Sequence, residues 1–368
     1  MKILIFTNYA NGLYLFRKEL VENFQKNGHE VFVSVPFDDN CVKLKNMGVT
    51  LLEAPLERHG MNPAKDIKLF GHYMRSIKKI RPEVVLTYTI KPNIYGALAA
   101  RIKRIPYICN VTGLGLAIES GGTLSKILLK FYSISMKKAG KVFFQNERNM
   151  KFMQERGVAE KNAGLLPGSG VNLLEHPFSD YPSEKDGIHI LAVLRVMKDK
   201  GVSEYLEMVR TLKPKYPDVF FELVGEYEED ERENFEPEIN NLVDLRYLKY
   251  YGHIDNVPEV MASNHIVVHP SYHEGLSNVL LEAAACGRPV LATNVNGCKE
   301  TLDADRSGYL FEPRDAKSLI LAVEKILSLS EEKRREMGAL GRRWVEERFD
   351  RKLVIEAYNK ELKKLKSV

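Results

Sequence analysis

Cysteine is scarce in this 368-residue chain, which has four cysteines and no Cys-x-x-Cys pair. Such isolated cysteines argue against a disulfide framework and a zinc site, and they favour a reducing compartment. Long apolar runs are also missing, because the longest fall well short of the ~18–20 residues of a membrane-spanning helix. The first residues, MKILIFTNYANG, turn polar after a short apolar run and predict a buried strand rather than a signal peptide. These absences favour a cytoplasmic location.

Glycine and proline occur at ordinary frequencies, with 25 and 16 residues, which excludes collagen-like and low-complexity chains. Charge, in contrast, is unevenly distributed. Residues 1–182 hold 26 Lys and Arg against 15 Asp and Glu, a net charge of +11, and residues 183–368 carry −6. The basic half predicts an anionic partner, such as a phospholipid surface or a phosphorylated acceptor. Nucleic acid is disfavoured because no binding motif or Arg-rich run is present. A merely solvated lysine surface is the alternative.

Short β-branched runs alternate with helical patterns, which predicts βαβ units and parallel sheets. The predicted strands of the first half are residues 2–7, 30–35, 49–53, 84–88, 107–110 and 141–145. The same alternation of strands and helices begins again in the second half, with predicted strands at residues 188–193, 219–224, 247–251, 266–269 and 290–292. Between the halves, residues 166–187 are rich in Pro and Gly and lack periodicity, as a connecting segment does.

The expected fold is therefore α/β, with two doubly wound parallel-sheet domains that face each other across a cleft. We place the first domain at residues 1–170, a linker at 171–187, and the second domain at 188–345. A helix at 346–368 is expected to pack outside the second sheet or to cross back to the first. Ligands of such sheets bind beyond the carboxyl ends of the strands, so candidate site residues should lie there.

The densest signal is HEGLSNVLLEAAACGRPVLATN, residues 273–294. Glu274 follows a predicted strand and residues 278–285 predict a helix, so this is a strand–loop–helix junction. Such a junction offers unpaired N–H groups and the positive end of a helix dipole, and it can hold phosphate. Glu282 has apolar neighbours, so we expect a buried carboxylate with a partner rather than a solvated one. The two carboxylates could flank an anionic ligand that carries hydroxyl groups.

A second signal is LRVMKDKG, residues 194–201, which follows the predicted strand 188–193. It places Arg195 and Lys200 five residues apart across a turn, an arrangement suited to clamping a diphosphate. Basic loop residues are common, so this signal is weak alone. The interpretation is strengthened by the second loop suited to phosphate binding, the one that contains Glu274, which follows another strand of the same predicted sheet.

These two segments resemble motifs of a known family. EGLSNVLLE is similar to the E-x7-E motif of retaining glycosyltransferases of family 4, and LRVMKDKG resembles their G-R-L-x-x-x-K-G element, with Leu194 where glycine is usual. The resemblance covers essentially the whole chain and implies the GT-B fold of two Rossmann-like domains. TYTIKPNIYGALAAR and ICNVTGLG resemble a narrower group of bacterial enzymes that extend lipid-linked oligosaccharides. That group includes N-acetylgalactosaminyltransferases acting on undecaprenyl-diphosphate sugars, and capsule and O-antigen transferases.

The resemblance implies roles in the second domain. Arg195 and Lys200 would neutralise the donor diphosphate, and Glu274 would face the donor sugar close to the reacting carbon. Glu282 would accept hydrogen bonds from the ribose. The remaining nucleotide contacts would come from the loop before the helix and from two further strand ends: Gly225, Ile254, Gly275, Leu276, Ser277 and Asn278. Gly225 could equally serve a tight turn.

In the first domain the implied acceptor or donor-sugar loops contain Gly12, Lys91, Thr112 and Gly113. Many family members have two glycines in the loop after the first strand, where this chain has only Gly12. A family histidine near the donor sugar falls at Thr112. Glycines beside it permit close backbone approach or a plain turn, and Lys91 could meet an acceptor phosphate or be an ordinary exposed lysine.

The same resemblance implies a metal-independent, retaining mechanism, in which two cations and a helix N-terminus stabilise the departing diphosphate. No Asp-x-Asp motif lies in a convincing loop, so we expect no metal site and no cofactor apart from the donor substrate. UDP rather than another nucleotide is inferred from the narrower group alone.

Two segments of the basic half predict amphipathic helices. Residues 63–82 place basic side chains at helical spacing: Lys65, Lys68, His72, Arg75 and Lys79. Residues 123–141 mix lysines with large apolar residues. Such helices can lie on anionic lipid, although a core-packed helix with a solvated lysine face is the commoner case. We expect peripheral contact with the inner face of the cytoplasmic membrane.

The sequence thus favours a transferase that moves a sugar, expected to be a HexNAc, from a UDP-sugar to a polyprenyl-diphosphate-linked acceptor. The alternatives are a soluble GT-B enzyme acting on a small sugar or sugar phosphate, a nucleotide-sugar epimerase, and a binding module without turnover.

Overall fold

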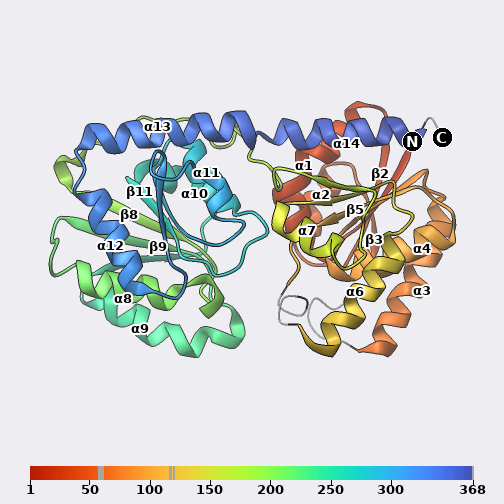
Figure 1. The fold of residues 1–368 in the computed structure, drawn as a ribbon, viewed down its shortest axis with the longest axis horizontal. Helices are drawn as coiled ribbons and strands as arrows, with labels where there is room; N and C mark the ends of the chain where they lie inside the picture. The colour runs from red at the N-terminus through yellow and green to blue at the C-terminus, as the bar shows by residue number, and fades with distance from the viewer. Residues whose placement is uncertain (57–61, 116–117, 119–120, 367–368) are drawn as a thin grey trace. The chain divides into compact units, whose positions relative to one another are not determined.

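The computed structural model of the chain describes residues 1–56, 62–115, 118 and 121–366. The chain divides into two compact units, each with one parallel sheet (Figure 1). The first unit is Met1–Ser169 together with Lys352–Val368, and the second is Gly170–Arg351. The last helix of the chain thus belongs to the first unit.

Seven parallel strands form the first sheet in the order β3-β2-β1-β4-β5-β6-β7. Their bounds are β1 Lys2–Phe6, β2 Glu30–Val35, β3 Thr50–Glu53, β4 Val84–Tyr88, β5 Tyr107–Val111, β6 Lys141–Phe144 and β7 Ala163–Leu165. The first six lie where the sequence predicts strands. The three-residue β7 was not predicted, since it is too short to show a period.

Helices cover both faces of this sheet. One face carries α1 (Ala10–Lys26), α2 (Cys41–Asn46) and α14 (Arg351–Lys366), whose Val354, Tyr358 and Leu362 are buried in the core beneath them. The other face carries α3 (Pro63–Ile80), the π-helical η1 (Pro92–Gly96), α4 (Ala97–Ile102), α6 (Gly122–Met136) and α7 (Glu147–Gln154).

One expectation about α3 is wrong. His72 was placed on the exposed basic face of this helix, but its Nε2 lies 2.9 Å from Oγ of Ser34 on β2. The ring therefore lies between the helix and the sheet, where burial lowers the pKa of His72. The exposed basic stripe of α3 consists of its lysines and Arg75 without the histidine.

Six parallel strands form the second sheet in the order β10-β9-β8-β11-β12-β13. Their bounds are β8 Ile188–Val193, β9 Val219–Val224, β10 Leu248–Gly252, β11 Ile266–His269, β12 Val290–Thr293 and β13 Gly308–Phe311. The first five match the predicted strands closely. The edge strand β13 was missed because only four residues, beginning with glycine, carry its pattern.

The second sheet is also covered on both faces. The helices α8 (Val202–Leu212), α9 (Arg232–Asp244) and α12 (Ala316–Leu327) pack on one core. The helices α10 (Val257–Ser263), α11 (Asn278–Ala285) and α13 (Glu331–Arg348) contribute to the cores on the other side. Short 3-10 turns occur at η2 Glu184–Asp186, η3 Lys198–Lys200, η4 Glu229–Glu231 and η5 Lys299–Thr301.

Residues 171–187 belong to the second unit through specific bonds. The guanidinium of Arg288 is fully buried and donates to the carbonyl oxygens of Ser179 and Asp180. Arg334 donates through Nε to Glu184 at 2.7 Å. These bonds hold the segment against the second unit.

Each sheet has one switch point, where the strand order reverses. It lies between β1 and β4 in the first sheet and between β8 and β11 in the second. Open α/β sheets bind ligands outside the carboxyl ends of the strands at such a point. No helix within the described residues has the length and apolarity needed to cross a bilayer.

Candidate functional site

Lys200 and Glu274 meet at the switch point of the second sheet. Lys200 lies in η3 after β8, and Glu274 follows β11, so the two strands that flank the switch point each supply one residue. Their charged atoms Nζ and Oε1 are 2.6 Å apart, and Nζ also lies 3.3 Å from Oγ of Ser271. Both side chains are less than one-fifth exposed. The sequence predicted both residues as site residues but did not predict this ion pair.

The backbone around this pair allows little adjustment. Gly201 follows η3 with φ +71°, and a Cβ there would lie 2.1 Å from the carbonyl oxygen of Pro270. The N–H of Tyr272 donates to the carbonyl of Asp199 at 3.0 Å, which joins the two loops directly. Only glycine at residue 201 allows the loop after β8 to approach the loop after β11 this closely.

His269, which the sequence did not predict as a site residue, also contacts Glu274. Nε2 of His269, the last residue of β11, lies 3.1 Å from Oε1 of Glu274. Burial would raise the pKa of Glu274, but the charge of Lys200 and the hydrogen bond with His269 outweigh it and hold the pKa well below its usual range. Glu274 is therefore an anion in the free protein. A polar residue ending an apolar strand is the signal that could have identified His269.

Arg195 pairs with a different carboxylate from the one that Lys200 contacts. Its Nη1 lies 2.6 Å from Oε2 of Glu228, and its side chain is about half exposed. Glu228 precedes η4 after β9, the next strand of the sheet. The two predicted cations thus each have their own carboxylate, and a diphosphate held by both would have to compete with Glu228 and Glu274.

The first turn of α11 lies next along the loop from Glu274. Oγ of Ser277 caps the helix by accepting the N–H of Leu280 at 3.4 Å, while the N–H of Ser277 donates to Gly297 at 2.7 Å. Ser277 therefore uses its own N–H internally, which leaves Asn278 as the stronger candidate for an anion contact. Such a contact would come from an N–H group of Asn278, because its Oδ1 can only accept; that Oδ1 is buried, and no hydrogen bond to it is found within the described residues.

The other predicted members of this loop differ in surroundings. Leu276 is 6% exposed and packs in the core with Leu281 and Val345, so its side chain is a packing residue. Gly275 lies between it and Glu274 in the same loop. Any contact of Leu276 with a ligand would have to come from its backbone.

Glu282 lies one turn into α11, as predicted, with its side chain 19% exposed. Its Oε2 is 3.9 Å from Nε2 of His176, which comes from the segment predicted as a linker. The predicted partner thus exists, but nothing in the spacing of the sequence indicated a histidine 106 positions away.

Gly225 and Ile254 occupy the ends of neighbouring strands. Gly225 has φ +146°, and a Cβ would lie 1.7 Å from the carbonyl oxygen of Leu194. Its own carbonyl accepts the hydroxyl of Tyr250 at 2.8 Å. Gly225 is thus required by close backbone packing between β8 and β9. Ile254 packs partly against the apolar core beneath α10 and α11.

The candidates of the first unit also lie near a switch point. Nζ of Lys91, just after β4, is 3.0 Å from Oδ1 of Asp66, and both side chains are less than one-fifth exposed. Thr112 and Gly113 follow β5, and a Cβ on Gly113 would meet open space. The placement of Gly12 in a loop is wrong, because α1 begins at Ala10 and Gly12 lies in its first turn.

The switch point of the second unit brings a cation close to a helix N-terminus. The positive charge of Lys200 and the N-terminus of α11, equivalent to about +0.5 charge, lie at adjacent strand ends. Within the described part of the chain, no group of three His, Cys, Asp or Glu side chains is placed to hold a metal ion.

Two family models match the chain. Residues 177–344 match "Glycosyl transferases group 1", and residues 2–146 match "Glycosyl transferase 4-like". Together these matches span most of both units, and the first contains the whole arrangement around Lys200 and Glu274.

Curated relatives and solved structures agree with the models. The chain is 28% identical over 352 residues, 91% of its length and 90% of the relative's, to the N,N'-diacetylbacillosaminyl-diphospho-undecaprenol alpha-1,3-N-acetylgalactosaminyltransferase of Campylobacter jejuni. It is 26% identical to the UDP-Gal:alpha-D-GlcNAc-diphosphoundecaprenol alpha-1,3-galactosyltransferase of Escherichia coli, over 71% of the chain and 70% of that protein. The fold matches Anabaena Alr3699/HepE in complex with UDP, with a TM-score of 0.82, 18% identity, and coverage of 99% and 100% of the two chains. With its two Rossmann-like sheets and both halves matched, the chain belongs to the glycosyltransferases of the GT-B fold.

Proposed function

We propose that this glycosyltransferase moves a sugar, a HexNAc by analogy with its relatives, from a UDP-sugar to a saccharide linked to undecaprenyl diphosphate. The observation that carries the proposal is the Lys200–Glu274 pair beside the N-terminus of α11 at the switch point of the second sheet. In this proposal Lys200 would contact the donor diphosphate, and Glu274 would lie beside it. The names of the Campylobacter and Escherichia coli relatives support the acceptor class.

The chemistry follows from where charge develops. The bond between the anomeric carbon and the diphosphate oxygen breaks, and the acceptor hydroxyl oxygen bonds to that carbon on the same face, which retains the configuration. The hydroxyl proton passes to the leaving diphosphate. Fixed positive groups stabilise the charge on that leaving group, and we propose that Lys200, Arg195 and the α11 N-terminus do so without a metal ion.

Donor binding would change the partners of the charged pair. Lys200 would turn from Glu274 toward the diphosphate, because two phosphates offer it more negative charge than one carboxylate. Glu274 would keep its hydrogen bond with His269, and its other oxygen would accept hydroxyl groups of the donor sugar. Glu282 would accept from the ribose. Loss of Lys200 should therefore affect both the charge of the site and the orientation of Glu274.

We assign the acceptor to the first unit, whose loops after β1, β4 and β5 contain the remaining candidates. Its net basic charge supports an acceptor that carries a diphosphate and lies in the inner face of the cytoplasmic membrane. In this assignment Lys91 would have to exchange Asp66 for a phosphate, as Lys200 would exchange Glu274.

The test is release of UDP from a set of UDP-sugars, measured with and without undecaprenyl-diphosphate-linked acceptor. We expect release with one HexNAc donor that depends on the lipid-linked acceptor and continues in EDTA. Transfer to a free sugar phosphate instead would identify an enzyme with a small acceptor. Interconversion of the sugar would identify an epimerase. Binding of UDP without turnover on any acceptor would contradict transfer, and loss of activity in EDTA restored by Mg²⁺ would contradict the metal-free mechanism.

A further inference from the structure

His269 is a buried histidine at the end of the strand that leads to Glu274. It is the last residue of β11 and is 3% exposed, and β11 pairs with β8 on one side and with β12 on the other, so the main chain of His269 is fixed. Because a carboxylate can only accept, Nε2 of the ring donates to Oε1 of Glu274. Nδ1 is buried, and no hydrogen bond to it is found within the described residues. In that part of the chain, the contact with Glu274 is therefore the hydrogen bond that orients this ring.

Two hydrogen-bond donors share a single oxygen of Glu274. Nζ of Lys200 lies 2.6 Å from Oε1, the atom that His269 also contacts. The second oxygen, Oε2, has no hydrogen bond to any residue that the structure describes, and the side chain is 17% exposed. An ionised carboxylate has about four lone-pair sites on its two oxygens. Oε2 is therefore the atom that can accept the hydroxyl groups of a ligand.

The main chain of Glu274 has little freedom to move. Gly297, in the loop after β12, has φ +87°, and a Cβ there would lie 2.4 Å from the carbonyl oxygen of Glu274. The carbonyl of Gly297 in turn accepts the N–H of Ser277 at 2.7 Å. Because the main chain is held in this way, the direction of Oε2 depends on the side-chain torsions of Glu274. Those torsions are held by the contacts of Oε1 with Lys200 and His269.

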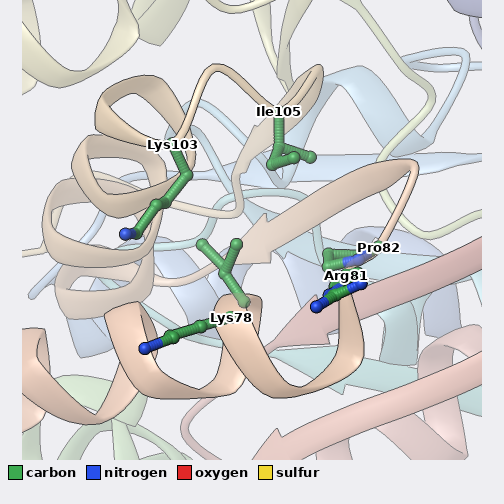
Figure 2. A pocket seen from close by; sticks show the side chains of 6 residues that line it. Lys78, Arg81, Pro82, Lys103 and Ile105 are labelled. Atoms are coloured by element: carbon green, nitrogen blue, oxygen red, sulfur yellow. The ribbon is translucent and has the colours of Figure 1, made fainter.

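This arrangement differs from a pocket of the first unit that is also lined by cations. Figure 2 shows Lys78, Arg81 and Lys103 around a cavity of about 240 Å³. These residues precede β4 and β5, so the pocket lies at the amino edge of the sheet, opposite the edge at which ligands of such sheets bind. All three side chains are exposed, and within the described residues none has a hydrogen bond or ion pair that fixes its direction. A polar group with a fixed direction, which the selection of a substrate requires, is found instead at Glu274.

Donor binding would leave His269 as the remaining partner of Oε1. In the proposed function Lys200 turns toward the donor diphosphate, so its bond with Glu274 is lost. We propose that His269 is a positioning residue, which holds Glu274 so that Oε2 faces hydroxyl groups of the donor sugar and thereby selects that sugar. The inference rests on the proposed function in one respect, because it takes a UDP-sugar as the ligand of this site. At 3% exposed, His269 acts through Glu274 and not by direct contact with the ligand.

The experiment compares substitutions at the two ends of β11. His269→Leu removes the hydrogen-bond donor, and His269→Gln keeps an N–H group at a similar distance from the main chain. His265→Leu is the matched control, because His265 is 2% exposed and immediately precedes β11. Its ring nitrogens contact the main chain of His189 and Ser183. Isothermal titration measures the affinity for UDP and for two UDP-sugars that differ in the configuration of one hydroxyl group, UDP-N-acetylglucosamine and UDP-N-acetylgalactosamine.

UDP lacks the sugar, so its affinity should be the same in His269→Leu and in the wild type. The affinity for the preferred UDP-sugar relative to UDP should fall about tenfold, and turnover about a hundredfold, because Glu274 is no longer held in place. The preference between the two sugars should be lost, and His269→Gln should restore most of it. His265→Leu should change neither the ratio nor the preference. Equal weakening of UDP and the UDP-sugars in His269→Leu, or no recovery in His269→Gln, overturns the proposal.

The melting temperature of every variant is measured first. If His269→Leu unfolds, His269→Asn replaces it, because the shorter amide cannot reach Glu274. Absence of sugar transfer by the wild type to any acceptor would contradict the proposed function, while the ratio of UDP-sugar to UDP affinity would still decide the role of His269. Equal affinity of the wild type for UDP and for both UDP-sugars would overturn the inference, since Glu274 would then make no favourable contact with the sugar.

Discussion

The two sheets have the same strand order around their switch points, yet they place charge there differently. In the second unit, Lys200 and Glu274 come from the two loops that flank the switch point. In the first unit, the comparable Lys91 is bonded to Asp66 on α3, which also accepts the hydroxyl of Tyr95. The positive charge of Lys91 is thus paired with a carboxylate on a helix that covers the sheet, whereas that of Lys200 is paired with a carboxylate in another strand-end loop.

The positively charged side chains of the two units therefore lie in different kinds of position. The second unit carries net negative charge overall, but Arg195 and Lys200 lie at its strand ends, where the proposed leaving diphosphate would develop charge. The first unit is strongly basic, and 13 of its 31 Lys and Arg residues lie on or directly after α3, α4 and α6. Under the proposed function, net charge would attract the anionic acceptor to the first unit, and the geometry at the strand ends would place the leaving diphosphate in the second.

The largest expected effect is that of Lys200→Ala. Removing this cation should lower turnover by about 10²–10³-fold, because in the proposed mechanism it stabilises the leaving diphosphate and orients Glu274. Steady-state UDP release measures the loss. The matched control is Lys198→Ala, an exposed lysine of the same turn, which should retain nearly normal rates. A comparable loss in Lys91→Ala would remove the distinction between the two switch points.

A second test uses acid pH. Hydrogen bonds from His189, Tyr251 and Asn264 overcome the effect of burial and lower the pKa of Glu222 to about 2. The unfolded chain then takes up the proton first as pH falls. The stabilisation is complete above about pH 5 and is lost as pH falls toward about 2, a change of about 2 kcal/mol after screening.

Trp344, the single tryptophan, lies in α13, so its fluorescence follows urea unfolding of the second unit alone. In Glu222→Gln, the free energy of unfolding should be lower at pH 7 and should approach the wild-type value only near pH 2. Glu233→Gln, which changes an exposed carboxylate of α9, is the control and should behave like wild type in its pH dependence. An unchanged acid slope in Glu222→Gln would show that this cluster does not determine the acid stability of the second unit.

For Lys91→Ala we expect a loss of stability of about 1–2 kcal/mol, because Asp66 is left largely buried without its cation. Urea unfolding followed by circular dichroism measures it. The double variant Lys91→Met with Asp66→Asn should recover part of the loss, since no charge is then unpaired. If stability is unchanged but acceptor KM rises, Lys91 serves the acceptor rather than the fold, and the contrast with Lys200 weakens.

The smallest effect is expected for Glu282→Ala, about tenfold weaker UDP binding with little change in the rate at saturating donor. Isothermal titration with UDP measures it. Glu347→Ala, an exposed glutamate of α13, is the control. Unchanged UDP affinity in Glu282→Ala would leave its contact with His176 as its only role.

Of the thirteen strands in the described part of the chain, eleven follow from the sequence, because buried parallel strands are short runs of β-branched and apolar residues. The positions of Lys200, Glu274 and Glu282 at strand ends and in the first turns of a helix follow from motif spacing. The strands β7 and β13 do not, because three or four residues that include glycine carry too little pattern.

The sequence did not predict which residues form ion pairs or hydrogen bonds with one another. Glu228 for Arg195, Asp66 for Lys91, His269 for Glu274 and Ser34 for His72 are chosen by strand order and helix packing. The sequence by itself determined which residue types stand at the ends of which strands, because periodicity and turn chemistry are local. Only the tertiary structure decided which charges meet, because an ion pair depends on distances between segments that chain separation does not specify.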